Sequence, residues 1–281
     1  MKICGVVVLY NPSSTINDKI SSYINEIDKL FIVDNSKVDN SHLLLKNNKI
    51  KYIPNYDNLG ISSALNMAAR FASDEGFDWL LTMDQDSFFE DDNLYRLIEY
   101  TKVCDYSNVG VISPWHNTKS GETRPKEDIE ERIDVMTSGN LVNLSAWAKV
   151  SGWKDWFFID NVDIEFCMNL NVNGYKIVRL NYVELEHNLG DISIKRAFGR
   201  QFVCSNHNYI RQYYMVRNLY YLKDMYYDSF PEYIDYMVRG MRGRFKNILV
   251  WEKDKYRKIR NMIRGYRDYK HNIKGIYSYK D

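Results

Sequence analysis

The chain has 281 residues, of which 45% are hydrophobic, a composition that excludes a disordered protein and allows one sizeable domain or a domain with an appendage. Its formal net charge of +1 hides a division, because residues 1–190 carry 18 Lys/Arg against 28 Asp/Glu whereas residues 191–281 carry 20 against 9. This division predicts an acidic part that carries the chemistry and a basic part that contacts an anionic surface.

The first half of the chain alternates between strand and helix patterns. Short apolar runs predict five strands, at residues 3–9, 30–33, 50–53, 79–83 and 109–113. Apolar residues at helical spacing predict helices at residues 16–27, 61–72 and 91–103. This alternation is typical of an α/β fold with a mostly parallel central sheet.

Polar residues follow three of these predicted strands, as Tyr10-Asn11, Asp34-Asn35 and Asp84-Gln85-Asp86. Ligands of open parallel sheets bind at the carboxyl ends of the strands, so we expect these residues to line one crevice. Asp84 and Asp86 offer oxygen ligands for Mg²⁺ or Mn²⁺, which points to nucleotide diphosphate chemistry. The alternative is a pair of solvated loop carboxylates, since Asp-X-Asp is common by chance.

The second half has a less regular pattern. Residues 116–132 have little apolar content and predict a mobile loop or insertion. Helices are predicted at residues 144–150 and 164–171, and a strand at residues 175–185 leads to Glu186-His187. Gly174 is a candidate carboxyl-terminal helix cap.

The last third contains 14 of the 23 tyrosines, and residues 239–270 alone carry 12 Lys/Arg and 3 acidic residues among apolar and aromatic ones. This pattern predicts a helix that lies in the headgroup region of an anionic membrane. The alternative is a basic helix whose apolar side packs on the rest of the chain or on a second subunit, as in a homodimer.

Several features bear on the compartment. The four cysteines (Cys4, Cys104, Cys167 and Cys204) are widely spaced, so neither a zinc site nor a disulfide framework is expected, and a reducing cytoplasm fits. The first residues run directly into a strand without a signal-peptide pattern, and no stretch approaches the roughly 18 apolar residues that span a bilayer. We therefore expect a soluble protein of the cytoplasm, or one peripheral to the inner face of the cytoplasmic membrane.

The ordered set of motifs resembles the inverting family 2 glycosyltransferases with the GT-A fold, and specifically their rhamnosyltransferase-like branch. The matching stretches are residues 7–11, 33–36, 58–60 with Ala64 and Asn66, 84–86, 138–139, 158–165, 187, 213–214 and 217–218. The resemblance implies a Rossmann-like sheet with helices on both faces and a C-terminal helical extension. It implies a catalytic domain at residues 1–190, with a nucleotide-sugar half (1–115) and an acceptor half (133–190), and a basic, Tyr-rich extension at 191–281.

Asp34, at the end of the second predicted strand, can accept a hydrogen bond from N3–H of uracil or thymine in the donor nucleotide. Asp at such a position is also common as a turn cap. The resemblance implies that the other donor-binding residues are Tyr10, Asn11, Asn35, Asn58, Gly60, Asp84 and Arg217. Asn58 and Gly60 are equally compatible with an ordinary helix start. Arg217 would pair with the pyrophosphate, the alternative being a surface arginine on an amphipathic helix.

For the chemistry, the resemblance implies metal ligation by Asp86 and His187, with Asp84 sharing the ion or binding the ribose. It assigns the catalytic base to Asp163, and contacts with the acceptor to Ser138, Gly139, Asp160 and Glu165. The acidic residues also fit a simpler role, because Asp and Glu complement the positive end of a helix.

The resemblance thus implies transfer of a sugar, L-rhamnose from dTDP-L-rhamnose being favoured, to a glycan or lipid-linked glycan in bacterial surface polysaccharide synthesis. The expected cofactor is Mn²⁺ or Mg²⁺. UDP-sugar transfer, such as that by a galactofuranosyltransferase, remains open within this class. A glycoside hydrolase has no use for a metal-diphosphate site. A nucleic-acid-binding protein that uses the basic tail is the alternative from another class, and the acidic first 190 residues argue against it.

Overall fold

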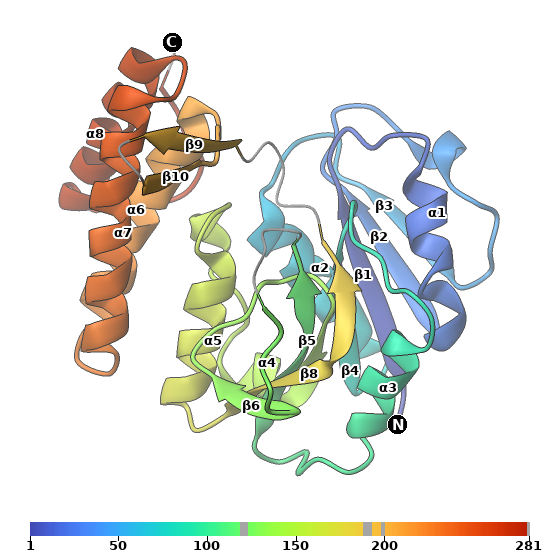
Figure 1. Cartoon of the computed structure of the whole chain (residues 1–281). Coiled ribbons are helices and arrows are strands. Elements are labelled where there is room, and N and C mark those ends of the chain that lie inside the picture. Colours follow the sequence, from blue (N-terminus) through green and yellow to red (C-terminus); the bar gives the residue numbers. More distant parts are fainter. Residues whose placement is uncertain (119–122, 188–192, 198–199, 280–281) are drawn as a thin grey trace. The chain divides into compact units, whose positions relative to one another are not determined.

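The computed structural model describes residues 1–118, 123–187, 193–197 and 200–279 (Figure 1). Within residues 188–203 it describes the backbone alone, and elsewhere in these ranges it describes side chains as well. The chain divides into two compact units. The first comprises Met1–Asp155 and Asp163–Asn188, and the second comprises Trp156–Val162 and Leu189–Asp281.

The first unit contains an eight-stranded sheet with the strand order β3-β2-β1-β4-β7-β5-β8-β6. Its strands are β1 (Ile3–Leu9), β2 (Lys29–Asp34), β3 (Ile50–Pro54), β4 (Trp79–Asp84), β5 (Val109–Asn117), β6 (Ile129–Arg132), β7 (Asn140–Asn143) and β8 (Lys176–Glu186). Strands β1 to β4 are parallel to one another, β7 is antiparallel to both β4 and β5, and β6 is antiparallel to β8. The predicted α/β class with a mostly parallel sheet is therefore confirmed.

Buried apolar runs hold this sheet together. In β4, Trp79, Leu80, Leu81 and Met83 are all buried, as is typical of a central strand covered on both faces. Helix α2 (Ile61–Asp74) packs against β1, β2 and β4 with a face that includes Ala64, Ala68 and Ala72. The other helices of this unit are α1 (Ile16–Ser21), α3 (Asn93–Tyr100), α4 (Leu144–Lys149) and α5 (Val162–Val172).

Several predicted boundaries were wrong. The predicted helix at 16–27 is α1 followed by a 3-10 turn at Ile24–Glu26, and the predicted helix at 91–103 is the shorter α3. The segment 116–132 is not simply a loop, because β5 continues through His116 to Asn117 and β6 occupies Ile129–Arg132. Strand β6 is mostly exposed at the sheet edge, so its sequence lacks an apolar run.

The second unit contains a hairpin, β9 (Ser193–Ala197) and β10 (Arg200–Cys204), and the helices α6 (Tyr209–Tyr226), α7 (Pro231–Val250) and α8 (Lys255–Lys270). Helix α6 packs along α8, and a Cβ atom at Gly265 would overlap the carbonyl oxygen of Tyr213. Glycine at this position therefore lets the two backbones approach closely. In the part of the chain that the structure describes, no helix combines the length and apolar character needed to cross a membrane.

Candidate active site

The ends of the central strands bring the predicted polar residues together. Leu9 at the end of β1 is paired with Asp34 of β2, and Val8 is paired with Asp84 of β4. The side chain of Gln85 ties β1 to β4, because its Oε1 accepts from Tyr10 N at 3.0 Å and its Nε2 donates to Tyr10 O at 3.3 Å. Gln85 was expected only to line the crevice, and its link to Tyr10 was not predicted, because the strand order is needed to show what lies beside it.

Asp84, Asp86 and His187 form a cluster in which one potential ligand atom from each residue lies within 4.8 Å of the others. Opposite ligands around one small divalent ion are separated by about 4 Å, so little side-chain movement is needed to surround an ion. Carboxylates suit both Mg²⁺ and Mn²⁺, and the borderline Mn²⁺ also tolerates an imidazole as the third ligand. The residues present therefore fit the predicted divalent metal.

Neighbouring groups fix the orientation of these ligands. His187 Nδ1 lies 2.7 Å from Ser87 Oγ, and the backbone N–H of Asp84 donates to Ser138 Oγ at 3.0 Å. Burial lowers the pKa of His187, and the Asp86 carboxylate opposes this shift. The neutral imidazole that burial favours is the form that binds metals.

A short bridge explains how His187 reaches residues that lie one hundred positions earlier. Phe88 N donates to Glu186 O at 3.2 Å, and Glu186 N donates to Phe88 O at 3.1 Å. This pairing joins the segment after Asp86 to the end of β8, and His187 follows directly. The strand pattern of residues 175–185 predicted the end of β8, but it did not predict this bridge.

Ser138 and Gly139 do not occupy the acceptor-facing positions predicted for them. Both are buried, and the carbonyl oxygen of Ser138 lies 2.6 Å from Nε2 of the buried His116, whose pKa burial lowers to about 4. Gly139 has φ +78, and a Cβ there would come within 2.7 Å of Leu185 Cδ2. These residues therefore support Asp84 and the sheet, and this placement is at odds with direct contact to an acceptor.

Asp34 was predicted to bind the nucleobase, but its carboxylate already has hydrogen-bond partners within the protein. Asp34 is buried, and its carboxylate accepts from Ser36 N at 2.8 Å, Asn40 Nδ2 at 2.8 Å and Tyr52 OH at 2.8 Å. These bonds fit the turn-capping role of Asp after a strand. Asp34 therefore orders the loop beyond β2.

The other residues that were predicted to bind the nucleotide sugar form a hydrogen-bonded network at the start of α2. Asn35 Nδ2 donates to Gly60 O at 3.0 Å, and Asn58 Oδ1 accepts from Gly60 N at 3.0 Å. Gly60 has φ +84, a conformation that favours glycine. Beside them, Asn11 N donates to Ser36 Oγ at 2.8 Å, and Tyr10 is exposed.

A hollow opens beside the metal-ligand candidates. It is lined by the loop after β1, by α1, and by the Asp84-Gln85-Asp86 segment: Pro12, Ser13, Thr15, Ile16, Lys19, Gln85 and Asp86. Lys19 supplies a cation in this lining, and its Nζ lies 3.6 Å from the centroid of the Phe88 ring. Lys19 was not among the predicted site residues, because a lysine on a short helix carries no signal of its own in the sequence.

The predicted catalytic base lies in the first turn of α5. Asp163 is half-buried, its Oδ1 accepts from Ile164 N at 2.9 Å, and it lines a small internal cavity with Thr82, Thr137 and Asn140. Glu165 follows two residues later on the same helix. It is buried, so it does not present a carboxylate at the surface for an acceptor.

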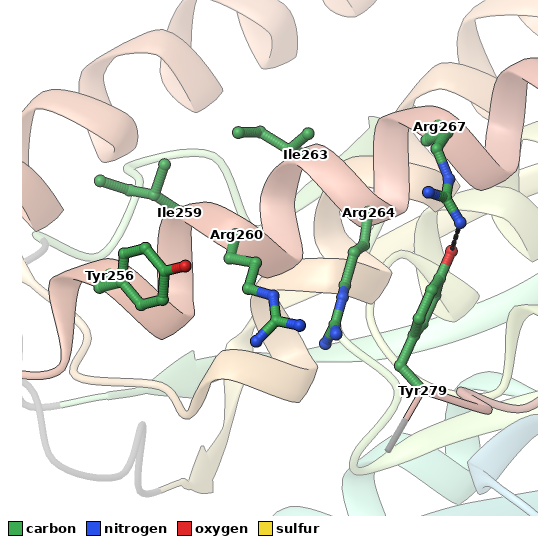
Figure 2. A pocket seen from close by; sticks show the side chains of 7 residues that line it. All are labelled: Tyr256, Ile259, Arg260, Ile263, Arg264, Arg267 and Tyr279. Carbon is green, nitrogen blue, oxygen red and sulfur yellow. Dashed lines mark hydrogen bonds between the residues drawn. The ribbon is translucent and has the colours of Figure 1, made fainter. Parts of the chain in front are cut away.

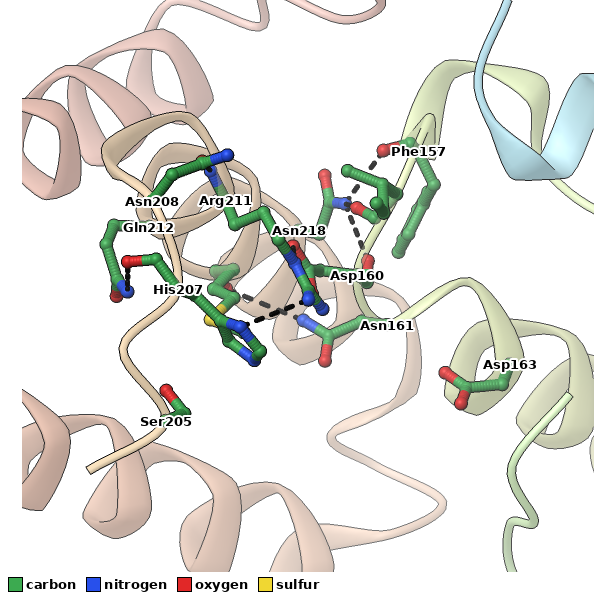
Figure 3. A network of polar contacts seen from close by, with 12 residues as sticks. Phe157, Asp160, Asn161, Asp163, Ser205, His207, Asn208, Arg211, Gln212 and Asn218 are labelled. Carbon is green, nitrogen blue, oxygen red and sulfur yellow. Dashed lines mark hydrogen bonds and ion pairs between the residues drawn. The ribbon is translucent and has the colours of Figure 1, made fainter. Parts of the chain in front are cut away.

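Asp160 and Arg217 belong to the second unit, where they have structural partners; Figure 3 shows Asp160 beside Arg211. Asp160 forms an ion pair with Arg211, and its side chain is 5% exposed. The Arg217 guanidinium is fully buried and donates to the carbonyl oxygens of Trp156, Phe157 and Gly275. Since these carbonyls and neighbouring side chains occupy its donors, the predicted pyrophosphate contact of Arg217 is contradicted, as is the alternative of a surface arginine.

Known proteins share this sequence pattern and fold. Residues 5–159 match the family model described as Glycosyl transferase family 2. The chain is 24% identical to the dTDP-rhamnosyl transferase RfbF of Shigella flexneri, over 78% of this chain and 79% of that protein.

Two solved structures are similar in fold: GalNAc-T7 with UDP, GalNAc and Mn²⁺ (TM-score 0.61, 12% identity, 83% of this chain) and TarS of S. aureus (TM-score 0.60, 14% identity, 97% of this chain). The chain spans about half of each of these two structures, 49% in both cases. The likeness confirms the predicted GT-A fold, and at such identities it shows the fold alone.

Proposed function

Because the chain belongs to glycosyl transferase family 2, we propose that it transfers L-rhamnose from dTDP-L-rhamnose to a glycan acceptor with inversion at the anomeric carbon. The proposal is carried by the cluster of Asp84, Asp86 and His187 beside the ends of β1 and β4. The choice of donor is supported by the similarity to a dTDP-rhamnosyl transferase.

Asp86 and His187, with Asp84, would hold Mn²⁺ or Mg²⁺, which when bound supplies positive charge to the departing nucleoside diphosphate. Ser87 and Ser138 keep the imidazole and the Asp84 backbone in place. On the nucleotide side, the exposed Tyr10 and the backbone of Asn11 face the donor, and the network of Asn35, Asn58 and Gly60 shapes the adjoining wall.

Asp163 is the proposed general base. It takes the proton of the acceptor hydroxyl while that oxygen attacks the anomeric carbon, and the nucleoside diphosphate leaves from the opposite face of the sugar. A single displacement of this kind needs no covalent enzyme intermediate.

The acceptor is proposed to be lipid-linked, and the reaction to occur at the cytoplasmic face of a membrane in surface polysaccharide synthesis. The excess of basic residues in residues 191–281 supports this part of the proposal.

Donor binding can be tested by thermal unfolding with a panel of nucleotide sugars and Mn²⁺. We expect dTDP-L-rhamnose to raise the melting temperature more than UDP-sugars do, because a ligand that binds the folded state stabilises it. Asp86→Ala should remove the Mn²⁺-dependent part of the increase, whereas the control Asp74→Ala, at the exposed end of α2, should retain it. A larger shift with a UDP-sugar would overturn the rhamnose assignment, and no shift with any donor would overturn the site.

The base assignment can be tested separately. Asp163→Asn should retain the shift with dTDP-L-rhamnose and lose transfer by about 100-fold or more, since a positioned base contributes that much to the rate. Asp160→Asn is the matched control, because Asp160 is paired with Arg211 and should affect stability more than the rate. Near-normal transfer by Asp163→Asn would contradict the assignment.

A further inference from the structure

The second unit has an apolar groove between helices α6, α7 and α8. Val216 and Met262 line it, and together with Ile248 they form a small buried core beneath it. The walls are large apolar side chains that remain exposed: Phe245 is 38% exposed, Leu249 45%, Ile263 63% and Tyr266 41%. A cluster of exposed apolar groups of this size on two neighbouring helices marks a surface that another molecule covers.

Basic side chains accompany the groove. Arg242 and Lys246 belong to its lining, and both are exposed. They are four residues apart on α7, so they lie on one face of that helix. The groove therefore combines an apolar interior with two cations that no acidic residue of its lining neutralises.

A second pocket continues the same pattern along α8 (Figure 2). Ile263 lines both pockets, and the second one also contains Arg260, Arg264 and Arg267. Arg264 and Arg267 donate to the hydroxyl groups of Tyr277 and Tyr279, at 2.8 and 3.1 Å, whereas Arg260 is exposed. Helix α8 thus presents an exposed apolar residue flanked by cations.

The charge distinguishes between the candidate occupants. In a twofold symmetric dimer through this surface, the groove would pack on a second copy of itself, which would bring Arg242, Lys246 and Arg260 close to a surface with the same excess of cations. Burying like charges in this way is unfavourable. An amphiphile with an anionic head and a hydrocarbon chain complements both the cations and the apolar walls.

We propose that this groove docks the second unit on a bilayer that contains anionic phospholipid, with an acyl chain along Phe245, Leu249 and Ile263 and the phosphate at Arg242 and Lys246. The structure thereby refines the sequence prediction of one membrane helix, because α7 and α8 are separate helices that form a groove. Only the biological role of this docking rests on the proposed function, because a glycosyltransferase on the membrane would meet a lipid-linked acceptor. Vesicle binding requires no nucleotide sugar, so the two proposals can fail independently.

The test is co-sedimentation of the full chain with vesicles of phosphatidylglycerol and phosphatidylcholine, compared with phosphatidylcholine alone. We expect binding only to the anionic vesicles. Phe245→Gln with Ile263→Gln should weaken it by about tenfold or more, because the exposed apolar groups no longer enter the bilayer. Arg242→Glu with Lys246→Glu should also weaken it by about tenfold or more.

Control variants outside the groove separate specific docking from general charge attraction. Tyr236→Gln, on α7 but outside the groove lining, should bind like the unmodified chain, and Lys253→Glu, between α7 and α8, should reduce binding less than either groove pair. Circular dichroism would verify that each variant is folded. Equal losses in Lys253→Glu and the groove variants, or binding that ignores Phe245 and Ile263, would overturn the proposal. So would light scattering that shows a dimer which the Phe245→Gln, Ile263→Gln pair converts to a monomer.

Discussion

Individual side chains hold an unusual backbone segment just before α5. Phe158, Asp160 and Asn161 have φ values of +66, +63 and +61, a region that non-glycine residues rarely adopt. Asn218 compensates for this conformation, because its Nδ2 lies 2.8–2.9 Å from the carbonyl oxygens of Phe157, Ile159 and Asp160 (Figure 3). The two hydrogens of one buried amide are thus shared among three carbonyl oxygens of this segment.

Removal of this amide should be costly. Asn218→Ala removes this donor from the carbonyl oxygens of Ile159 and Asp160, whereas the Phe157 carbonyl still accepts from Ile159 N, so we expect the free energy of unfolding to fall by about 2–3 kcal/mol. Urea denaturation followed by circular dichroism would measure it. Asn173→Ala removes an exposed amide that donates to Asn169, one turn earlier at the end of α5, and should change the free energy of unfolding by less than about 0.5 kcal/mol. Equal effects of the two substitutions would contradict the role given to Asn218.

The two residues Arg217 and Asn218 also show the limit of prediction from sequence. Both were part of the ordered set of family motifs, and a pyrophosphate contact was predicted for Arg217, but their contacts with the carbonyl oxygens of residues 156–160 were not predicted. An arginine that binds a phosphate and an arginine that binds carbonyl oxygens have the same side chain, and only burial and partners distinguish them. By contrast, Asp84, Asp86 and His187 were predicted as a group, and the structure brings them together.

At the level of elements, helix α7 contains two glycines in its interior. A Cβ atom at Gly240 or Gly243 would meet nothing within 4 Å, and both lie within Pro231–Val250. Because glycine costs about 0.5–1 kcal/mol relative to alanine inside a helix, Gly240→Ala and Gly243→Ala should each stabilise the protein by about that amount.

Thermal unfolding of the two single variants and of the double variant would check this expectation. The effects should add, since neither methyl group has a close neighbour. A loss of stability in either variant would show that α7 needs the flexibility of glycine rather than merely tolerating it.

Elements differ in how well the sequence predicts them. Strands β1, β2 and β4 were predicted because they lie in the middle of the sheet and are continuous apolar runs. Strand β7 has only four residues, and its end, Asn143, also caps α4 by accepting from Ser145 N and Ala146 N. Such a strand exists because β4 and β5 pair with it on either side, and this information is absent from its local pattern.

For the molecule as a whole, His207 should make stability depend on pH. Burial and the nearby Arg211, Arg244 and Lys258 lower the pKa of His207 to about 3. Its Nδ1 lies 3.2 Å from Arg211 Nη1, and an arginine can only donate, so the imidazole accepts and is neutral. Between pH 6.5 and 3 the unfolded chain binds a proton that the folded chain does not, and the free energy of unfolding should therefore fall as the pH falls.

Urea denaturation at pH 7, 6 and 5 would measure this slope. In His207→Asn, whose amide oxygen can still accept from Arg211, the slope should be smaller while the stability at pH 7 changes little. An unchanged slope would show that other groups, such as the buried His116, account for the whole dependence.

The place of β7 in the sheet has a consequence for synthesis on the ribosome. Strand β4 is complete at Asp84, but the strand that pairs with its outer edge begins only at Asn140. Until that stretch leaves the exit tunnel, the nascent polypeptide presents Leu80 and Leu81 on an open strand edge, a template for intermolecular pairing. Messages truncated to end between residues 85 and 139 should therefore yield insoluble product.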